Sequence, residues 1–170
     1  MATTQTLALQ GKIHKIDAGL EDDEQELRLL YGSNDVISFL QNDLPGLRSF
    51  HDASLNPRKE VAALIAEYAS GLPIEFDRQI KAFRRNAFHA LQGGVWYFKT
   101  PDLRIFGWFP CRDCFIAVYP DTFENVKGKE LYEGRRNQVI HFRNQLALDE
   151  PKFIPGDDPH AVLSNCIVSD

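Results

Sequence analysis

Cysteine is scarce in this chain of 170 residues: there are three, and two of them stand close together at Cys111 and Cys114. An odd and small number argues against a disulfide framework and predicts a reducing compartment. No run of about 18 apolar residues is present, so we expect no membrane-spanning helix and no membrane partner. The first 15 residues lack a basic start followed by a long apolar core, so we expect no secretory signal. Together these absences predict a cytoplasmic protein.

The familiar catalytic motifs are also missing. The sequence has no G-x-S-x-G, no H-E-x-x-H and no glycine-rich phosphate loop, and Gly93-Gly94 lacks the lysine and serine that such a loop needs downstream. Carboxylates paired at helical spacing inside an apolar pattern are absent as well, which gives hydrolases of the two-carboxylate kind no support. We therefore predict no cofactor and no metal as part of the function.

Negative charge dominates overall, with a net charge of −5, but its distribution is uneven. Residues 1–74 carry 6 basic and 11 acidic side chains, residues 75–143 carry 12 and 8, and residues 144–170 carry 1 and 5. Only the central block would attract phosphate, because its flanks would repel it. A dedicated nucleic-acid binder is usually basic throughout, so a mixed surface with chance clustering explains the pattern equally well.

The most informative segment is residues 95–119, VWYFKTPDLRIFGWFPCRDCFIAVY. Three runs rich in aromatic and β-branched residues are separated by Thr100-Pro101-Asp102 and by Pro110-Cys111-Arg112-Asp113, which favour turns. Two tight connections between three strands predict an antiparallel meander over 95–119. Both faces of these strands carry aromatics. We expect helices and the C-terminal tail to cover both, the alternative being an aromatic face left open to a partner or to stacked bases.

Helical patterns lie on either side of the meander. Asn56-Pro57 suits a helix start, and Gly71 suits its end. The apolar stripe between them comprises Val61, Leu64, Ile65 and Tyr68. We also predict a helix over 36–44, a helical pattern from Phe76 to Arg84, a last helical region near 131–146, and a short edge strand within 8–17. The order predicts an α+β fold, a small antiparallel sheet packed with helices.

Proline and glycine mark the end of the sequence. Pro151, Pro155, Gly156 and Pro159 follow Asp149 closely. We therefore predict a single α+β domain over 1–148 and an extended C-terminal arm over 149–170 that packs on it, with one further turn at 160–164.

Cys111-Arg112-Asp113-Cys114 has the spacing of half a zinc site. The remaining ligands would have to come from His89, His141, His160 or Cys166, which are scattered in the sequence. A redox pair usually stands at a helix N-terminus, where the dipole lowers the thiol pKa. A hairpin turn made by Arg112-Asp113 between two small, half-buried cysteines explains the motif without further ligands or a helix terminus.

The order of the expected elements and the amino-acid sequence of the central segment resemble the RelE/HigB-type toxin superfamily over roughly residues 55–128. That family shows a pattern like W-E-L-R … Y-R-I-x-Y-F … I-x-L-L-H-G-F-x-K. The corresponding runs here are 95–99 (VWYFK), 103–108 (LRIFGW) and 114–119 (CFIAVY). The resemblance implies a strand, two helices, a three-stranded meander and a variable C-terminal helix.

The resemblance also implies an activity, ribosome-dependent cleavage of mRNA, and partners, an antitoxin together with RNA or the ribosome. By position, Arg104 would stabilise the scissile phosphate and Lys99 would be its basic partner on the neighbouring strand. Tyr119 or Lys127 would handle the proton or stabilise the developing charge. Fixed cations suit a pentavalent phosphorane, and arginine can hold two of its oxygens.

An alternative hypothesis is that the protein has the fold of this superfamily but does not cleave RNA. The segment 119–124 (YPDTFE) has neither His-Gly-Phe nor a run of lysines, and the chain is acidic. A non-catalytic protein of phage or mobile-element origin, which acts by binding a protein partner, fits those departures. The sequence decides neither between the two hypotheses nor on the oligomeric state.

Overall fold

A computed structural model describes residues 2–77 and 87–169 of the chain. The helices and helical turns are α1 (Thr4–Leu9), α2 (Asn34–Ser38), η1 (Phe39–Asp43), η2 (Leu44–Gly46), α3 (Pro57–Ala69), η3 (Gln92–Gly94), α4 (Phe123–Gly128), α5 (Tyr132–Gln145) and α6 (Pro159–Val162). The strands are β1 (His14–Lys15), β2 (Leu29–Gly32), β3 (Ile74–Asp77), β4 (Ala87–Ala90), β5 (Val95–Lys99), β6 (Leu103–Cys111), β7 (Cys114–Thr122) and β8 (Cys166–Ser169).

The predicted α+β class and the antiparallel meander are confirmed, with β5, β6 and β7 paired in sequence. The sheet is larger than predicted and is mixed. Within the described ranges eight strands follow the order β1-β2-β7-β6-β5-β4-β3-β8. The pairs β2–β7, β3–β4 and β3–β8 are parallel, which corrects the expectation of a small, wholly antiparallel sheet. Parallel pairing joins segments far apart in sequence, and no local sequence pattern predicts it.

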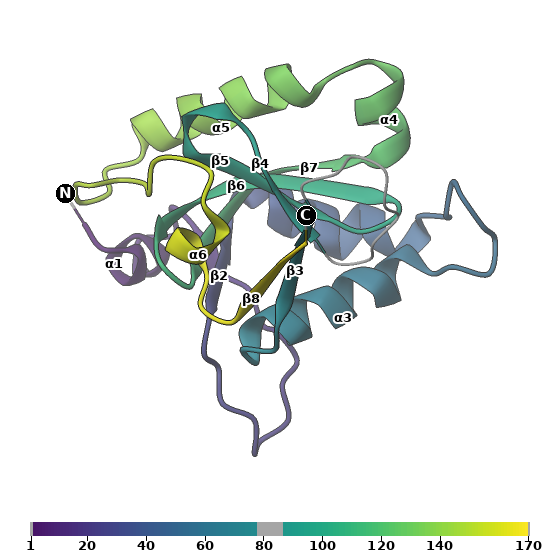
Figure 1. Ribbon diagram of the computed structural model, residues 1–170, viewed down its shortest axis with the longest axis horizontal. Coiled ribbons are helices and arrows are strands. Elements are labelled where there is room, and N and C mark those ends of the chain that lie inside the picture. Colours follow the sequence, from purple (N-terminus) through teal and green to yellow (C-terminus); the bar gives the residue numbers. More distant parts are fainter. Residues whose placement is uncertain (1, 78–86, 170) are drawn as a thin grey trace.

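Helices cover both faces of the sheet, as expected from the aromatics on both (Figure 1). On one face, α2, α3 and α6 pack over a core that contains Trp96, Phe98 and Phe115. On the other face, α1, α4 and α5 pack over a core that contains Phe106 and Trp108. The meander therefore lies between two apolar layers, and its aromatic rings do not form an open docking face.

Local chemistry sets several of the helix starts. Asn56 accepts a hydrogen bond from the Lys59 N–H at 3.2 Å and caps α3, whose apolar stripe is buried as the spacing predicts. Thr122 caps α4 in the same way through the Asn125 N–H. Ser33 caps α2 and also donates its hydroxyl proton to the Val118 carbonyl at 2.6 Å, which ties that helix to β7.

Of two local predictions in the first half of the chain, one is confirmed and one needs correction. The short edge strand predicted within 8–17 is β1 (His14–Lys15) at one edge of the sheet, and residues 8–9 end α1, which Thr3 caps. The helical pattern from Phe76 to Arg84 begins instead as β3, which runs to Asp77. The remainder of that pattern, residues 78–84, lies outside the described residues.

The C-terminal arm is extended as far as Asp158. Its backbone forms hydrogen bonds with the meander at Lys152 and Ile154. The Lys152 carbonyl accepts the indole N–H of Trp108 at 2.8 Å, and the Ile154 N–H donates to the Phe109 carbonyl at 3.0 Å. The arm then forms the short α6 and β8, which adds to the sheet beside β3. No helix in the described part of the chain is long and apolar enough to cross a bilayer.

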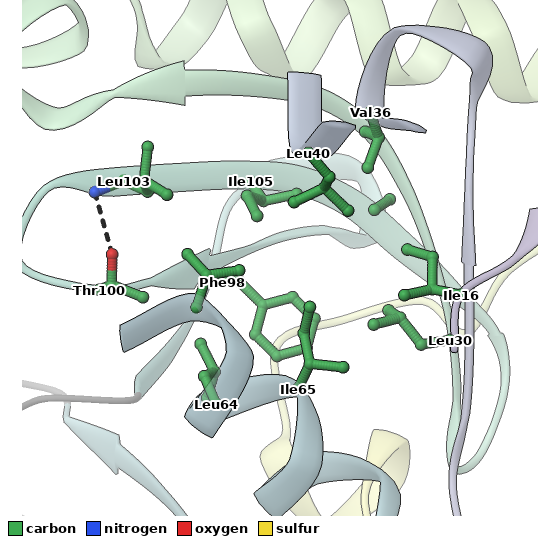
Figure 2. Close-up of a pocket in the computed structure, with 12 residues that line it drawn as sticks. Ile16, Leu30, Val36, Leu40, Leu64, Ile65, Phe98, Thr100, Leu103 and Ile105 are labelled. Atoms are coloured by element: carbon green, nitrogen blue, oxygen red, sulfur yellow. Dashed lines mark hydrogen bonds between the residues drawn. The ribbon is translucent and has the colours of Figure 1, made fainter. Parts of the chain in front are cut away.

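A small cavity of about 20 Å³ lies between the sheet, α2 and α3 (Figure 2). Aliphatic side chains such as Leu40, Leu64 and Ile105 surround it, and the Thr100 hydroxyl at its edge already accepts the Leu103 N–H at 3.1 Å. This volume holds about one water molecule and offers no polar partners for it. We interpret it as a packing gap in the core.

Candidate functional site

The predicted site residues gather at the end of the meander where β5 turns into β6 and β7 enters α4. Lys99 on β5 is paired in register with Arg104 on β6, and Arg104 with Asp121 on β7. Residues paired across neighbouring strands project from the same face, here the face under α4 and α5. Lys99 is half-buried there.

Arg104 is buried, with 4% of its surface exposed. Its Nη1 donates to the carbonyls of Thr100 at 2.6 Å and Leu103 at 2.8 Å, and its Nε donates to the Tyr132 hydroxyl at 3.4 Å. Its Nη2 has no hydrogen-bond acceptor within the described residues. The turn that precedes β6 thus fixes the orientation of the guanidinium, and Nη2 remains available as a donor to a ligand.

Tyr132, at the start of α5, is a component of this site that sequence reasoning missed. Its oxygen accepts the bond from Arg104 at 3.4 Å. Burial, the charge of Tyr132 and hydrogen bonding with it raise the pKa of Tyr97, while Arg104 opposes the rise, so Tyr97 stays neutral. Because Tyr132 is the acceptor toward Arg104, its hydroxyl keeps its own proton for donation elsewhere.

An aromatic cluster borders Arg104 on its outer side. We define the Phe123 cluster as Phe50, His51 and Phe123, with the cations Arg104 and Lys127. The ring centroids of His51 and Phe123 are 4.8 Å apart, and those of Phe50 and Phe123 are 6.2 Å apart. Above the Phe123 ring, Arg104 Cζ lies 4.8 Å and Lys127 Nζ 5.4 Å from the centroid, within cation–π range.

The turn before β6 holds the Phe123 cluster in place. The carboxylate of Asp102 accepts the Phe50 N–H at 2.8 Å, and its carbonyl accepts the Phe123 N–H at 2.7 Å. Phe50 nevertheless keeps 59% of its surface exposed, and Lys127 is exposed too. An exposed ring beside an exposed cation can stack a base or receive an apolar side chain that has an acidic neighbour.

Tyr119 lies on β7 two residues before Asp121, the residue paired with Arg104. The Arg135 guanidinium stacks over the Tyr119 ring at 4.2 Å and pairs with Asp121, and Tyr119 lines a different opening. That opening is a groove of about 410 Å³ between α2, β7 and α5. Its lining comprises Asp35, Val118, Tyr119, Asn137, Gln138, His141, Phe142 and Gln145.

The structure therefore brings together Lys99, Arg104 and Lys127, the three predicted cations, and places the fourth predicted residue, Tyr119, at the adjacent groove. The signal that would have found Tyr132 is weak, since a single tyrosine opening a helix matches no motif. Its pairing with Arg104 depends on how α5 packs over the meander.

The remaining motif, Cys111–Cys114, lies at the far end of the meander in the turn between β6 and β7. Among the residues that the structure describes, no three histidine, cysteine or carboxylate side chains are grouped so as to hold a metal ion. His160, one of the ligands considered, instead contacts Cys166 at 3.2 Å between Nδ1 and Sγ.

Comparisons with protein-family models, with curated proteins and with solved structures find no match to this chain.

Proposed function

We propose that this chain is a diverged RelE/HigB-type endoribonuclease whose site lies at the Arg104 end of the meander. The observation that carries the proposal is the hydrogen bond from Arg104 Nε to the Tyr132 hydroxyl, because it couples a fixed cation to a proton donor. The succession of β2, α2, α3, the meander and α5 contains the order that the resemblance implies, with β3 and β4 added between α3 and the meander, and it supports the same assignment.

The reaction class is attack of a ribose 2′-hydroxyl on the adjacent phosphorus. The P–O5′ bond breaks, and the products are a 2′,3′-cyclic phosphate and a free 5′-hydroxyl. The 2′-hydroxyl releases its proton to water as it attacks, and in this assignment Tyr132 gives its proton to the leaving 5′ oxygen and regains one from water afterwards. Arg104, which donates to the Tyr132 oxygen, stabilises the negative charge left on it in the meantime.

The cations of the site stabilise the transition state of this reaction. The unoccupied Nη2 of Arg104 and the ammonium groups of Lys99 and Lys127 would stabilise the charge that develops on the phosphoryl oxygens. The exposed ring of Phe50 would stack a base next to the scissile bond, a contact that tolerates any sequence.

The test is cleavage of mRNA in a cell-free translation reaction, mapped by primer extension. The wild-type protein should cleave translated message. Tyr132→Phe keeps the ring and removes the proton, so it should lower the rate by about 100-fold or more. Arg112→Ala, an exposed arginine at the opposite end of the meander, is the matched control and should cleave like wild type.

Circular dichroism on each variant establishes that the fold is retained. An active Tyr132→Phe protein, or a wild-type protein that leaves RNA intact in the presence of ribosomes, would overturn the endonuclease assignment.

A second function is favoured by one specific observation. Arg104 is 4% exposed and its Nη1 is committed to two backbone carbonyls, which suits a structural arginine better than one that meets a phosphate. In that case the chain is a non-catalytic protein that binds a protein partner, and the exposed Phe50 is the natural anchor. A growth defect on expression that is lost in Phe50→Ala, unchanged in Tyr132→Phe and unaccompanied by RNA cleavage would select this function.

A further inference from the structure

The two cysteines of the β6–β7 turn face each other across the hairpin. Cys111 and Cys114 are paired in register and separated by only Arg112 and Asp113, with Asp113 in the left-handed region at φ 61°. Cα atoms of residues directly opposite each other on antiparallel strands lie about 4.5–5.5 Å apart. A disulfide requires about 4.4–6.8 Å, so the backbone already has the separation that a bond between these sulfurs needs.

The environments of the two thiols differ sharply. Cys111 is exposed, whereas Cys114 is buried against the core under α1 and α5. Hydrogen bonding with Cys114 lowers the pKa of Cys111 to about 7. The same interaction, followed by burial, raises the pKa of Cys114 far above its ordinary value. At neutral pH the exposed sulfur is therefore the nucleophile, and the buried one keeps its proton.

No helix N-terminus stands at this turn, so the helix dipole that usually lowers a thiol pKa in a redox pair is absent. Hydrogen bonding with Cys114 on the neighbouring strand takes that role here. Low thiol pKa values arise wherever the thiolate is stabilised.

The turn itself is anchored on both sides, so the two sulfurs are held in position. Asp113 accepts the backbone N–H of Ser164 at 2.9 Å and its hydroxyl at 2.8 Å. The Asp113 N–H donates to the Val162 carbonyl at 2.9 Å, and its carbonyl accepts the Leu29 N–H at 2.8 Å. A fixed turn that already aligns both thiols favours a bond within the pair over a lasting bond to a third sulfur.

We propose that Cys111 and Cys114 form a dithiol–disulfide couple that exchanges with small-molecule disulfides of the glutathione type. The Cys111 thiolate attacks one sulfur of the small disulfide, forms a mixed disulfide and releases one thiolate, which takes up a proton from water. Cys114 then loses its proton and attacks Cys111 Sγ, which forms the Cys111–Cys114 bond and releases the second small thiol. Two protein thiols are oxidised, and one small disulfide is reduced to two thiols.

The experiment treats the reduced full-length protein with glutathione disulfide and follows its intact mass and its peptide map. Wild type should end with an intramolecular Cys111–Cys114 disulfide and no retained glutathione. Cys114→Ser should accumulate glutathione on Cys111, and Cys111→Ser should form neither product at this turn. Cys166→Ser, which removes the third cysteine, is the matched control and should behave like wild type.

A second measurement keeps the proposal testable if a variant folds poorly. The rate of alkylation of Cys111 by iodoacetamide should rise with a midpoint near pH 7 in the wild type. At pH 7 it should fall about threefold in Cys114→Ala, which removes the donor, since the thiolate fraction drops while the intrinsic nucleophilicity rises. A wild-type midpoint near 8.5, stable glutathione on Cys111 in the wild type, or oxidation that occurs only at Cys166 would each overturn the proposal.

Discussion

Arg135 holds Asp121 with two nitrogens at once: its Nε and Nη2 each lie 2.8 Å from Asp121 Oδ2. The contact ties α5 to the end of β7, and both side chains are largely buried. Asp121→Ala leaves the guanidinium without its carboxylate and should lower the free energy of unfolding by about 3 kcal/mol, measured by urea denaturation. Glu133→Ala removes an exposed ion pair from the same helix and should change it by less than about 1 kcal/mol. Equal effects of the two would contradict this account.

Gly107 and Gly134 make a matched pair for a second prediction. A Cβ on Gly107 would lie 2.0 Å from the Ile116 carbonyl oxygen, so Gly107→Ala must push β6 and β7 apart. A Cβ on Gly134, in the first turn of α5, meets nothing within 4 Å. We expect Gly107→Ala to unfold or strongly destabilise the protein, and Gly134→Ala to stabilise it by up to about 1 kcal/mol. Thermal unfolding of both variants checks the contrast, which would be lost if Gly107→Ala melted like wild type.

Arg28 is fully buried, with 1% of its surface exposed. Its nitrogens donate to four backbone carbonyls, those of Tyr68, Leu72, Ser164 and Asn165. Burial lowers its pKa, and Asp113 opposes that effect. Arg28→Met leaves those carbonyls unpaired and should cost about 4 kcal/mol or prevent folding. Arg28→Lys restores part of the donation and should cost less, while the exposed control Arg112→Met should stay within about 0.5 kcal/mol. Denaturant midpoints that do not follow this order would contradict the assigned role.

The stability of the reduced protein should depend on the protonation of Cys111. Its pKa is lowered on folding to about 7, so the folded state binds fewer protons than the unfolded state between about pH 7 and the ordinary thiol value. This contribution is present above the unfolded pKa and is lost as the pH falls through about 7. Relative to Cys111→Ser, the urea midpoint of the reduced wild type should therefore rise between pH 6.5 and pH 8.5. A constant difference across that range would show that no such shift exists.

The sequence predicted the parts of the fold that local chemistry decides. Asn56-Pro57 and the stripe that ends at Tyr68 define α3, and the turn residues around Asp102 and Asp113 define the meander. The parallel partners of the sheet were out of reach, because β2 joins β7 and β8 joins β3 across long stretches of chain. Their pairing depends on the packing of both layers, which no short window of sequence contains.

The candidate site shows the same division. Lys99 and Arg104 were predicted from the positions they hold in the resemblance to the toxin superfamily, and the register places them side by side. Tyr132 was missed because its contact with Arg104 follows from how α5 lies over the sheet. Tyr119 was placed on the correct strand, where the guanidinium of Arg135 stacks on its ring and the side chain lines the neighbouring groove.

The two tryptophans stand on neighbouring strands but belong to opposite cores, Trp96 to the layer under α3 and Trp108 to the layer under α5. Each indole is therefore an intrinsic optical reporter of one layer alone. Single-tryptophan forms of the protein would reveal by their emission whether the two halves of the interior melt in concert or one after the other.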